Sequence, residues 1–594
     1  MLNMRNKKFC ILILMVVGFL VYSFNLQNKL FWDDDDWIKG NVFVHDFAHT
    51  KEIFTQNILA GYGLNSNYYR PLLLLSFAGN YAIGSIKPLG YHLVNNGLHV
   101  ANGILIFLIL LGVFKRRLPA FLAALLFLIH PLQTEAVTYI SGRGDPMSVF
   151  FMLLTLWSFI KFETIGLLRG LTSKYLVGSL LSMVAAVLSR ETAVLMPVFL
   201  MIFYVSFLAV DGFWRSLKKS VIKTIPYWGI TVAYAVLRLT VFNFKNTINF
   251  YSQANDYTQH LSYRLYTFGH ALVEYFKLIF APVGLHMERD LPLKTSLFQW
   301  PVPLAVIIIL AVLGVGFWFY RKSQKLPTTN YQLQTNLWFF GWGWFFVALA
   351  PVSGIIPINA VMYEHWLYLP LIGFFTIVAF YLVKLFDYLK SKSHSIFYFL
   401  LSIFLVVYFS FFAYQSIQRN ILWGKPIEFY ESILKYNPNT VRIMNNLGNL
   451  YSEKGDIDQA AVMYQRAVSI PGGNLFAQPY YNLGNIYRDQ KNIEAAIEQY
   501  KKAIEVDSAF PFAYQNLAVI YANRGQLVEA AEMLEKVKKL RPTEPRVYYN
   551  LALIYTAQNK FSLAISNLEQ GLGFSGGDPE TEGAIKLLLT RLQN

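Results

Sequence analysis

Charged residues are scarce in this chain. Asp, Glu, Lys and Arg make up only 14% of its 594 residues, whereas a soluble globular protein carries about 25%. Hydrophobic residues account for 55%. A chain with so little charge cannot cover a soluble surface of this size with polar groups, so we expect an integral membrane protein whose apolar segments face lipid.

Cysteine and the common metal and nucleotide motifs are also lacking. The single cysteine, Cys10, has no second cysteine with which to form an intrachain disulfide. The sequence contains no Walker-type phosphate loop, no HExxH pair and no CxxC. Its histidines, such as His92, His99 and His130, stand singly rather than at metal-ligand spacing. We therefore expect no resident cofactor and no metal.

The formal net charge is +16, but its distribution does not indicate a nucleic-acid partner. Residues 425–594 contain 18 basic and 18 acidic side chains, so the whole excess lies in residues 1–424. It falls in short clusters between apolar runs, among them 115–117, 215–223 and 321–325. This is the positive-inside pattern of loops on the cytoplasmic side of a membrane.

The apolar runs between these clusters predict about eleven membrane-spanning helices. The first run has basic residues before it and aspartates after it, and it lacks the small residues of a cleavage site. We interpret it as a retained span with a cytoplasmic N-terminus. A further run, 264–283, would reverse the charge rule if it crossed, so we expect it to be re-entrant or to lie in the interface. The predicted spans are residues 9–26, 91–113, 118–130, 147–162, 175–189, 192–210, 224–243, 301–320, 335–350, 366–386 and 395–417.

Four consecutive aspartates, Asp33 to Asp36, follow the first span. Carboxylates are costly inside a bilayer, while the neighbouring Trp32 and Trp37 prefer its boundary. We therefore expect all four aspartates in water, just outside the membrane on the non-cytoplasmic side. Crowding of like charges raises the pKa of at least one of them, which suits a general base. The alternative is an acidic loop that only solvates and orients the segment.

Four arginines are predicted at the same membrane surface: Arg70, Arg143, Arg190 and Arg238. A guanidinium group keeps its charge and can bind a phosphate through two parallel hydrogen bonds. Several arginines facing an anionic cluster suit a phosphate-linked lipid donor, although each arginine could instead pair with a neighbouring carboxylate. The polar residues expected to support this site are His130, Glu135, Asp145, Glu191, Glu364 and His365.

From about residue 423 the sequence changes to a repeated pattern. An Asn-Leu-Gly or Asn-Leu-Ala triplet begins at Asn446, Asn482, Asn516 and Asn550, with spacings of 36, 34 and 34 residues. A 34-residue period with small and tyrosine positions is typical of the tetratricopeptide repeat, in which helix pairs stack into a solenoid. The four asparagines could bind the backbone of an acceptor peptide through their amides. They could equally be internal packing positions of the repeat.

Several strings of residues together resemble one known family. They are WDD at 32–34, YRPL at 69–72, YHLVNNGLHV at 91–100, HPLQTEAV at 130–137, GRGD at 142–145 and YEHWLYLP at 363–370. With the repeats that follow, they resemble the transmembrane and tetratricopeptide-repeat-containing O-mannosyltransferases, which belong to the GT-C class of glycosyltransferases. Two departures are the acidic run of four residues and the Arg190-Glu191 pair, where the family tends to carry Lys-Glu.

The resemblance implies an all-α protein. A polytopic GT-C membrane domain would occupy residues 1–422, and an exoplasmic tetratricopeptide-repeat α-solenoid would occupy residues 423–594. It also implies an inverting transfer of a sugar, mannose in the family, from a polyprenyl-phosphate donor to a Ser or Thr hydroxyl of an acceptor protein. Asp33 and Asp34 match the family's catalytic acidic pair, and no metal is required. The short loops favour a bacterial inner membrane with periplasmic repeats.

Three other functions are compatible with parts of the sequence. A catalytically silent scaffold would use the repeats to recruit partners and the membrane part as an anchor, but an anchor has no need for arginines and carboxylates on one face. A transferase of lipid-linked glycans to a non-protein acceptor would differ in the size of its cavity. A transporter would carry charged residues deep within its spans, whereas those found here cluster near the span ends.

Overall fold

A computed structural model describes residues 6–64, 66–169, 172–209, 211–241, 255–325, 329–358, 360–391, 395–470, 475–575 and 579–593. Every regular element within these residues is helical. The chain divides into two compact units, Met1–Phe429 and Tyr430–Asn594. The prediction of membrane helices followed by helical repeats is therefore confirmed at the level of the fold.

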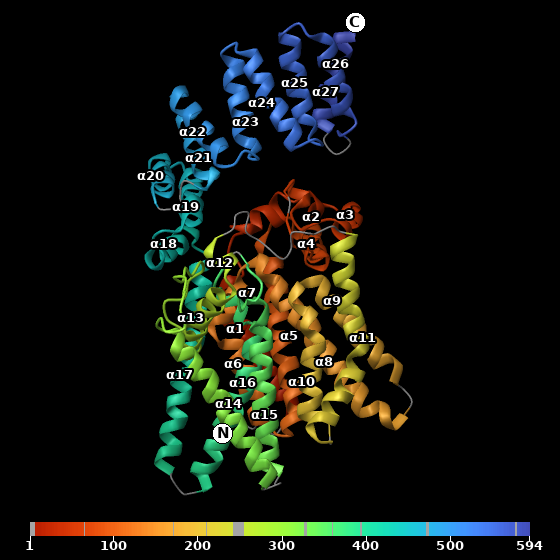
Figure 1. Ribbon diagram of the computed structural model, residues 1–594, viewed down its shortest axis with the longest axis vertical. Helices are drawn as coiled ribbons and strands as arrows, with labels where there is room; N and C mark the ends of the chain where they lie inside the picture. The colour runs from red at the N-terminus through yellow and green to blue at the C-terminus, as the bar shows by residue number, and fades with distance from the viewer. Residues whose placement is uncertain are drawn as a thin grey trace. The chain divides into compact units, whose positions relative to one another are not determined.

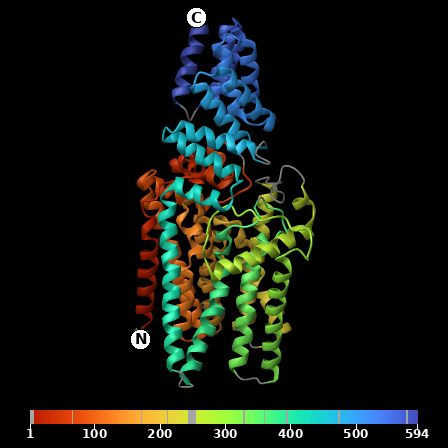
Figure 2. The ribbon, with the colours of Figure 1, turned by 90° about the vertical axis from the view of Figure 1, so that its left-hand side faces the viewer.

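The first unit is a bundle of long helices. Figures 1 and 2 show these helices running side by side, with the small helices α2, α3 and α4 lying together across one end of the bundle. The helices are α1 (Lys7–Tyr22), α2 (Val42–His45), α3 (Thr50–Thr55), α4 (Pro71–Gly84), α5 (Pro88–Phe114), α6 (Arg117–Ile129), α7 (Thr134–Thr138), α8 (Gly144–Arg169), α9 (Thr172–Ser189), α10 (Met196–Phe203), α11 (Phe213–Thr240), α12 (Asp256–Gln259), α13 (Leu261–Phe280), α14 (Val302–Lys325), α15 (Thr329–Leu349), α16 (Pro370–Ser391) and α17 (Ser395–Trp423).

Eight helical segments of the described residues are long and apolar enough to cross a membrane. A ninth span results if Arg117–Ile129 and Pro131–Thr138, which meet at a bend of 54°, are counted as one. The protein is thus a multi-pass integral membrane protein. The eight segments are Lys7–Asn25, Pro88–Phe114, Ile140–Thr164, Glu191–Leu208, Phe213–Thr240, Val302–Lys325, Pro370–Ser391 and Ile396–Trp423.

Two regions differ from the predicted set of spans, and a third agrees with it. The predicted span at 175–189 is a shorter apolar helix, Lys174–Ser189, and the predicted span at 335–350 lies in α15, which is not one of the eight. The region 264–283, expected not to cross, is mostly the continuous helix α13, which is also outside the set. The total of eleven spans stays a prediction.

The connections between the long helices, which we call joints, alternate along the chain between basic ones and ones that carry candidate site residues. Basic residues lie in the joint between α5 and α6, at the start of α11 and in the last turn of α14. The intervening joints, α6–α8, α9–α10 and α15–α16, carry the polar residues selected as site candidates. Neighbouring helices such as α5 and α6, α8 and α9, and α15 and α16 pack against each other. Since short joints connect antiparallel neighbours, the basic and the site-bearing joints lie at opposite ends of the bundle.

The second unit consists of stacked helix pairs. A single helix, α18 (Pro426–Tyr436), begins just before the unit boundary. Four helix pairs and a final helix follow in the described residues. They are α19 (Val441–Glu453) with α20 (Ile457–Ser469), α21 (Ala477–Asp489) with α22 (Ile493–Val506), α23 (Pro511–Asn523) with α24 (Leu527–Leu540), α25 (Pro545–Ala557) with α26 (Phe561–Leu572), and α27 (Pro579–Gln593).

The small residue after each Asn-Leu pair is matched in volume to a residue on the second helix of its repeat. A Cβ added to Gly448 would meet the ring of Tyr464 at 2.5 Å, and one added to Gly484 would meet Tyr500 at 2.5 Å. In the third and fourth repeats the small residue is alanine, and leucine replaces the tyrosine. A smaller residue at the first position thus goes with a larger residue at the second, so that the combined volume fits the space between the two helices of each pair.

Candidate functional site

The four aspartates lie in the turn that joins the first span to α2. Asp35–Lys39 forms a single π-helical turn. It follows Trp32, whose φ of 65° is in the left-handed region that non-glycine residues rarely adopt. Asp35 is about half exposed and forms an ion pair with Lys39 at 2.5 Å, whereas Asp33 and Asp36 are partly buried.

Asp34 does not lie in water, and for this residue the prediction was wrong. Only 2% of its surface is exposed. Its Oδ1 accepts hydrogen bonds from the backbone N–H and the hydroxyl of Ser141, at 2.9 and 2.5 Å, and its Oδ2 accepts the N–H of Phe31 at 3.3 Å. A carboxylate can enter the protein interior here because three donors replace its hydration.

Burial is also the main cause of the raised pKa values in this loop. It raises the pKa of Asp34 to about 7, and the charge on Asp33 adds to the rise, while the hydrogen bonds from Ser141 and Phe31 oppose it. Burial, followed by the charges of Asp33 and Asp35, raises the pKa of Asp36 to about 6. The expected direction of the shift is therefore present, but crowding contributes less than desolvation.

The segment 130–145 holds the aspartate loop against the bundle through Ser141. It contains two short 3₁₀ turns, η5 (Pro131–Gln133) and η6 (Ile140–Arg143), on either side of α7. The tight path needs glycine at position 142, because a Cβ there would lie 3.0 Å from the carbonyl oxygens of Glu135 and Ala136. This requirement gives a physical reason for the glycine of the GRGD string.

His130, a predicted supporting residue, has a structural role at the start of this segment. The buried ring accepts the N–H of Leu132 through Nδ1 at 3.3 Å, and its Nε2 lies 3.0 Å from the carbonyl oxygen of Ile279. Both ring nitrogens are thus engaged. His130 fixes the bend after α6 rather than facing the aspartates.

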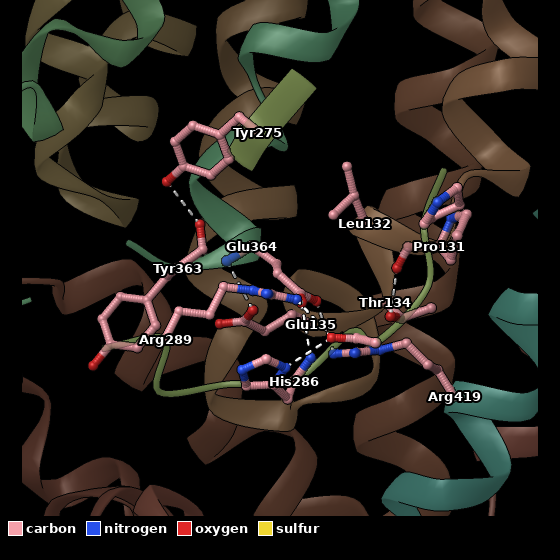
Figure 3. A network of polar contacts seen from close by, with 12 residues as sticks. Pro131, Leu132, Thr134, Glu135, Tyr275, His286, Arg289, Tyr363, Glu364 and Arg419 are labelled. Atoms are coloured by element: carbon pink, nitrogen blue, oxygen red, sulfur yellow. Dashed lines mark hydrogen bonds and ion pairs between the residues drawn. The ribbon is translucent and has the colours of Figure 1, made fainter. Parts of the chain in front are cut away.

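Glu135 and Glu364 are at the centre of a buried ionic network (Figure 3). One oxygen of Glu135 accepts the backbone N–H of Glu364 at 3.1 Å, and the other contacts Nδ1 of His365. Glu364 Oε1 accepts a hydrogen bond from Arg289 Nη2 at 2.9 Å, and Glu364 Oε2 lies 3.0 Å from Arg419 Nη2. Burial raises the pKa of Glu364, against the attraction of the two arginines. Three predicted supporting residues therefore meet in one place.

Arg289 and Arg419 were missed by the sequence analysis. Arg419 is the only charged residue of α17, and a lone charge in an apolar run is a signal that could have selected it. Arg289 lies in the irregular segment between α13 and α14, where no periodic pattern distinguishes it. The contact between the two residues and Glu364 depends on joints that are far apart in the sequence.

Arg143, one of the four predicted phosphate ligands, is buried and hydrogen-bonds to other groups of the protein. Its Nε donates to Asn95 at 2.6 Å, Nη1 donates to the hydroxyl of Ser76 at 3.0 Å, and Nη2 donates to the carbonyl oxygen of Tyr91 at 3.0 Å. The guanidinium also lies over the ring of Phe77, 4.6 Å from its centroid. The prediction that Arg143 is available to a donor phosphate is therefore corrected: it ties η6 to α4 and α5.

The other three predicted arginines form one group with two carboxylates, which we name the arginine cluster. Arg70 Nε donates to Glu191 Oε2 at 3.0 Å, and Arg238 Nη1 lies 3.7 Å from Glu191 Oε1. Arg190 Nη1 donates to Asp145. The structure thus brings Arg70, Arg190 and Arg238 together as expected, and each guanidinium has a carboxylate partner.

In the repeat unit, two of the four selected asparagines hydrogen-bond to the preceding repeat. Asn482 donates to Asn445 and Asn449 at 2.9 and 3.0 Å. Asn516 donates to Asn485 at 2.8 Å and to the hydroxyl of Tyr500 at 3.0 Å. Asn446 makes a longer bond of 3.5 Å to Tyr430, and Asn550 is exposed. These contacts favour the packing interpretation over the peptide-binding one for Asn482 and Asn516.

Comparisons with known proteins agree with the motifs. Tetratricopeptide-repeat models match residues 441–474, 484–523, 513–541 and 545–576. The chain is 24% identical over 473 residues to a protein O-mannosyl-transferase of Caenorhabditis elegans, which covers 77% of this chain and 62% of the relative. The chain is similar to protein O-mannosyl-transferases. This confirms the resemblance drawn from the motifs.

A second relative is also named a protein O-mannosyl-transferase. Protein O-mannosyl-transferase TMTC3 of Mus musculus is 25% identical over 475 residues, covering 75% of this chain and 49% of the relative. The chain thus spans between about half and two thirds of the length of these curated relatives. Among solved structures, the apo oligosaccharyltransferase of Archaeoglobus fulgidus aligns with a TM-score of 0.40 and 13% identity, over 73% of this chain and 59% of that one.

Proposed function

We propose that this protein is a membrane glycosyltransferase that transfers mannose from a polyprenyl-phosphate donor to a Ser or Thr hydroxyl of an acceptor protein. The proposal rests on the three contacts that the segment 130–145 makes. Through Ser141 it holds Asp34, through Glu135 it reaches the buried ionic network, and through Asp145 it reaches the arginine cluster. One continuous segment therefore gathers a carboxylate loop and several fixed positive charges at one end of the bundle, as transfer from a lipid phosphate requires.

Within the aspartate loop we assign different roles to the two residues of the catalytic pair. Both oxygens of Asp34 accept hydrogen bonds from the protein, so Asp34 is a positioning residue. Asp33 precedes it on the same turn and is partly exposed. We assign Asp33 as the general base, with its carboxylate oriented by the anchored Asp34.

The proposed step balances without a metal or an oxidant. Asp33 accepts the proton of the acceptor hydroxyl, and the hydroxyl oxygen attacks the anomeric carbon of the sugar from the face opposite the phosphate. The bond between that carbon and the phosphate oxygen breaks, and polyprenyl phosphate leaves with the bonding electrons. The anomeric configuration is inverted. A general base contributes roughly 10²- to 10⁴-fold to the rate of such a step.

The test is sugar transfer by the full-length protein in lipid nanodiscs, with polyprenyl-phosphate mannose and a Ser/Thr-rich acceptor. Asp33→Asn should lower kcat by roughly 10²- to 10⁴-fold without changing the unfolding temperature. Asp35→Asn is the matched control, because Asp35 belongs to the same run, is about half exposed and forms a surface ion pair with Lys39. Full transfer by folded Asp33→Asn would contradict the assignment of the base.

We also propose that the repeats lie on the non-cytosolic side, in the periplasm of a bacterial cell. The basic joints would then lie in the cytoplasm and the site-bearing joints outside, as the charge rule requires. Labelling of a cysteine introduced at the exposed Asn550 with a membrane-impermeant maleimide tests this orientation in intact cells. Labelling only after lysis would contradict it. Cys10 is buried and provides little background signal.

A further inference from the structure

Two buried arginines have N–H groups that the protein does not satisfy. Arg419 is only 7% exposed, and neither its Nε nor its Nη2 has a hydrogen-bond partner. Its Nη2 is 3.0 Å from Glu364 Oε2, but that oxygen also accepts no hydrogen bond, so the contact is an ion pair without a directed N–H. The Nε of Arg289 is likewise unpartnered, in a side chain that is 12% exposed. Buried donors without acceptors are costly and are rare unless a ligand supplies the acceptor.

The two guanidinium groups are aimed at a common place. Figure 3 shows Arg289 and Arg419 entering from opposite sides, with their guanidinium groups directed toward the middle of the network and His286 beside them. Nη2 of Arg289 is held by the carbonyl oxygen of Gly284 at 2.8 Å and by Glu364 at 2.9 Å, which orients its remaining donors. The donors are thus fixed before any ligand arrives, which lowers the entropic cost of binding.

The carboxylates of the network leave arginine donors open to a further acceptor. Glu135 directs one oxygen at His365 and the other at the backbone N–H of Glu364, so it does not hydrogen-bond to either arginine. Glu364 is the only carboxylate in ion pairs with Arg289 and Arg419 within the described residues. Because the charge of Arg419 also acts on Glu135, the two guanidinium groups face two carboxylates, and the open N–H donors rather than an excess of charge favour an anion. A phosphodiester carries one negative charge and several acceptor oxygens.

The arginine cluster is the weaker candidate, because two carboxylates accept hydrogen bonds directly from its guanidinium groups. Arg70, Arg190 and Arg238 each have a carboxylate partner, at Glu191 or Asp145. A phosphate there would have to compete with carboxylates already bonded to the same guanidinium groups. The pair formed by Arg289 and Arg419 is therefore the better anion site, although the sequence pattern selected the other one.

Two hydrogen bonds from the segment 130–145 also connect the arginine pair to the aspartate loop. Asn420, next to Arg419, hydrogen-bonds to the hydroxyl of Thr138. Ser141, three residues further along the same segment, holds Asp34. We infer that Arg289 and Arg419 bind the phosphate group of the polyprenyl-phosphate sugar and of the polyprenyl phosphate that leaves. This inference rests on the proposed function, and it assigns donor recognition to residues other than those of the arginine cluster.

The first experiment measures donor kinetics of the full-length protein in nanodiscs. Arg289→Lys and Arg419→Lys keep the charge that balances Glu364 but remove the planar set of donors. Each should raise the KM for polyprenyl-phosphate mannose by roughly 10- to 100-fold, since a charged hydrogen bond has this effect. The KM for the acceptor should not change. Arg190→Lys is the competing variant from the arginine cluster, and Arg116→Lys is the exposed control, paired with Asp387.

The second experiment needs no transfer and so separates this inference from the proposed function. Polyprenyl phosphate should raise the unfolding temperature of the wild type and of Arg116→Lys, but not that of Arg289→Lys or Arg419→Lys. If Arg419→Lys does not fold, the single variant Arg419→Gln takes its place, because Glu364 then keeps its ion pair with Arg289 and no buried carboxylate is left without a partner. Such loss of stabilisation supports the site even if no sugar is transferred.

Three results would overturn the inference. One is a donor KM that rises in Arg190→Lys but not in the Arg289 and Arg419 variants. Another is stabilisation by polyprenyl phosphate that persists in folded Arg289→Lys and Arg419→Lys. The last is equal stabilisation by inorganic phosphate at the same concentration, which would identify a free phosphate rather than a lipid phosphate as the ligand.

Discussion

The two units of the protein use buried polar side chains differently. In the repeat unit, the selected asparagines recur every 34 to 36 residues, and two of them, Asn482 and Asn516, donate to an asparagine of the preceding repeat. In the membrane unit, several buried polar groups lie in non-repeating joints and carry full charges, and some have donors without acceptors. Because successive repeats are similar, a polar group of one repeat can bond to the equivalent group of the next. A joint is not repeated in this way and can hold charge in place for a ligand.

The largest loss of stability expected from this difference is at Glu191. Glu191→Gln leaves Arg70 and Arg238 without their ionised partner, so the free energy of unfolding should fall by about 3–5 kcal/mol. Glu498→Gln in the repeat unit is the matched control, because its pair with Lys502 is exposed and contributes little. Chemical unfolding of each variant in mixed micelles gives the comparison. Equal losses in the free energy of unfolding at both sites would show that the buried and the exposed ion pair contribute alike to stability.

The pH dependence of stability gives a second contrast. The pKa of Asp34 rises from its ordinary 3.8 to about 7 on folding. Between pH 4 and 7 the folded protein thus keeps a proton that the unfolded chain has released. Stability from this group is full below pH 4 and falls as the pH rises to 7, by up to about 1.4 kcal/mol per unit.

Asp34→Asn should remove this slope, whereas Asp35→Asn should keep it. The unfolding midpoint measured between pH 4 and 7 checks both variants against the wild type. Parallel curves for the wild type and Asp34→Asn would show that Asp34 does not take up the proton on folding. The repeat unit offers no carboxylate buried as deeply as Asp34 among its described residues.

Packing in the repeat unit should respond to volume rather than to charge. Gly448→Ala places a methyl group 2.5 Å from Tyr464 and should destabilise the protein by about 1–3 kcal/mol. Adding Tyr464→Leu recreates the alanine and leucine pair of the third repeat and should restore part of the loss. Thermal unfolding of the single and double variants measures the rescue. If the double variant were no more stable than Gly448→Ala, the two positions would not be matched in volume.

The smallest effect separates the two interpretations of the repeated asparagines. Asn516→Ala loses two hydrogen bonds and should lower stability by about 1–2 kcal/mol, with an unchanged KM for the acceptor peptide. Asn550→Ala, at the exposed equivalent position, should alter neither quantity. A raised acceptor KM for both variants, with normal stability, would instead indicate that the asparagines bind peptide.

Several features of the site were predictable because they depend on short-range chemistry. The acidic run beside tryptophans, the alternation of basic and polar joints, and the convergence of Arg70, Arg190 and Arg238 follow from charge and chain order. The burial of Asp34 and the internal bonds of Arg143 were not predictable, because they require Ser141, Asn95 and other partners more than 40 residues away. The role of Arg289 was hidden for the same reason.

By itself, the sequence determined that this chain spans a membrane, that its end folds as 34-residue helical repeats, and which residues resemble an O-mannosyltransferase. These properties depend on composition and period, which a linear chain displays directly. Only the tertiary structure decided which arginines are already paired and which keep unsatisfied donors. That distinction depends on the partners that folding brings together, and in this protein Arg289 lies 75 residues from Glu364 along the chain.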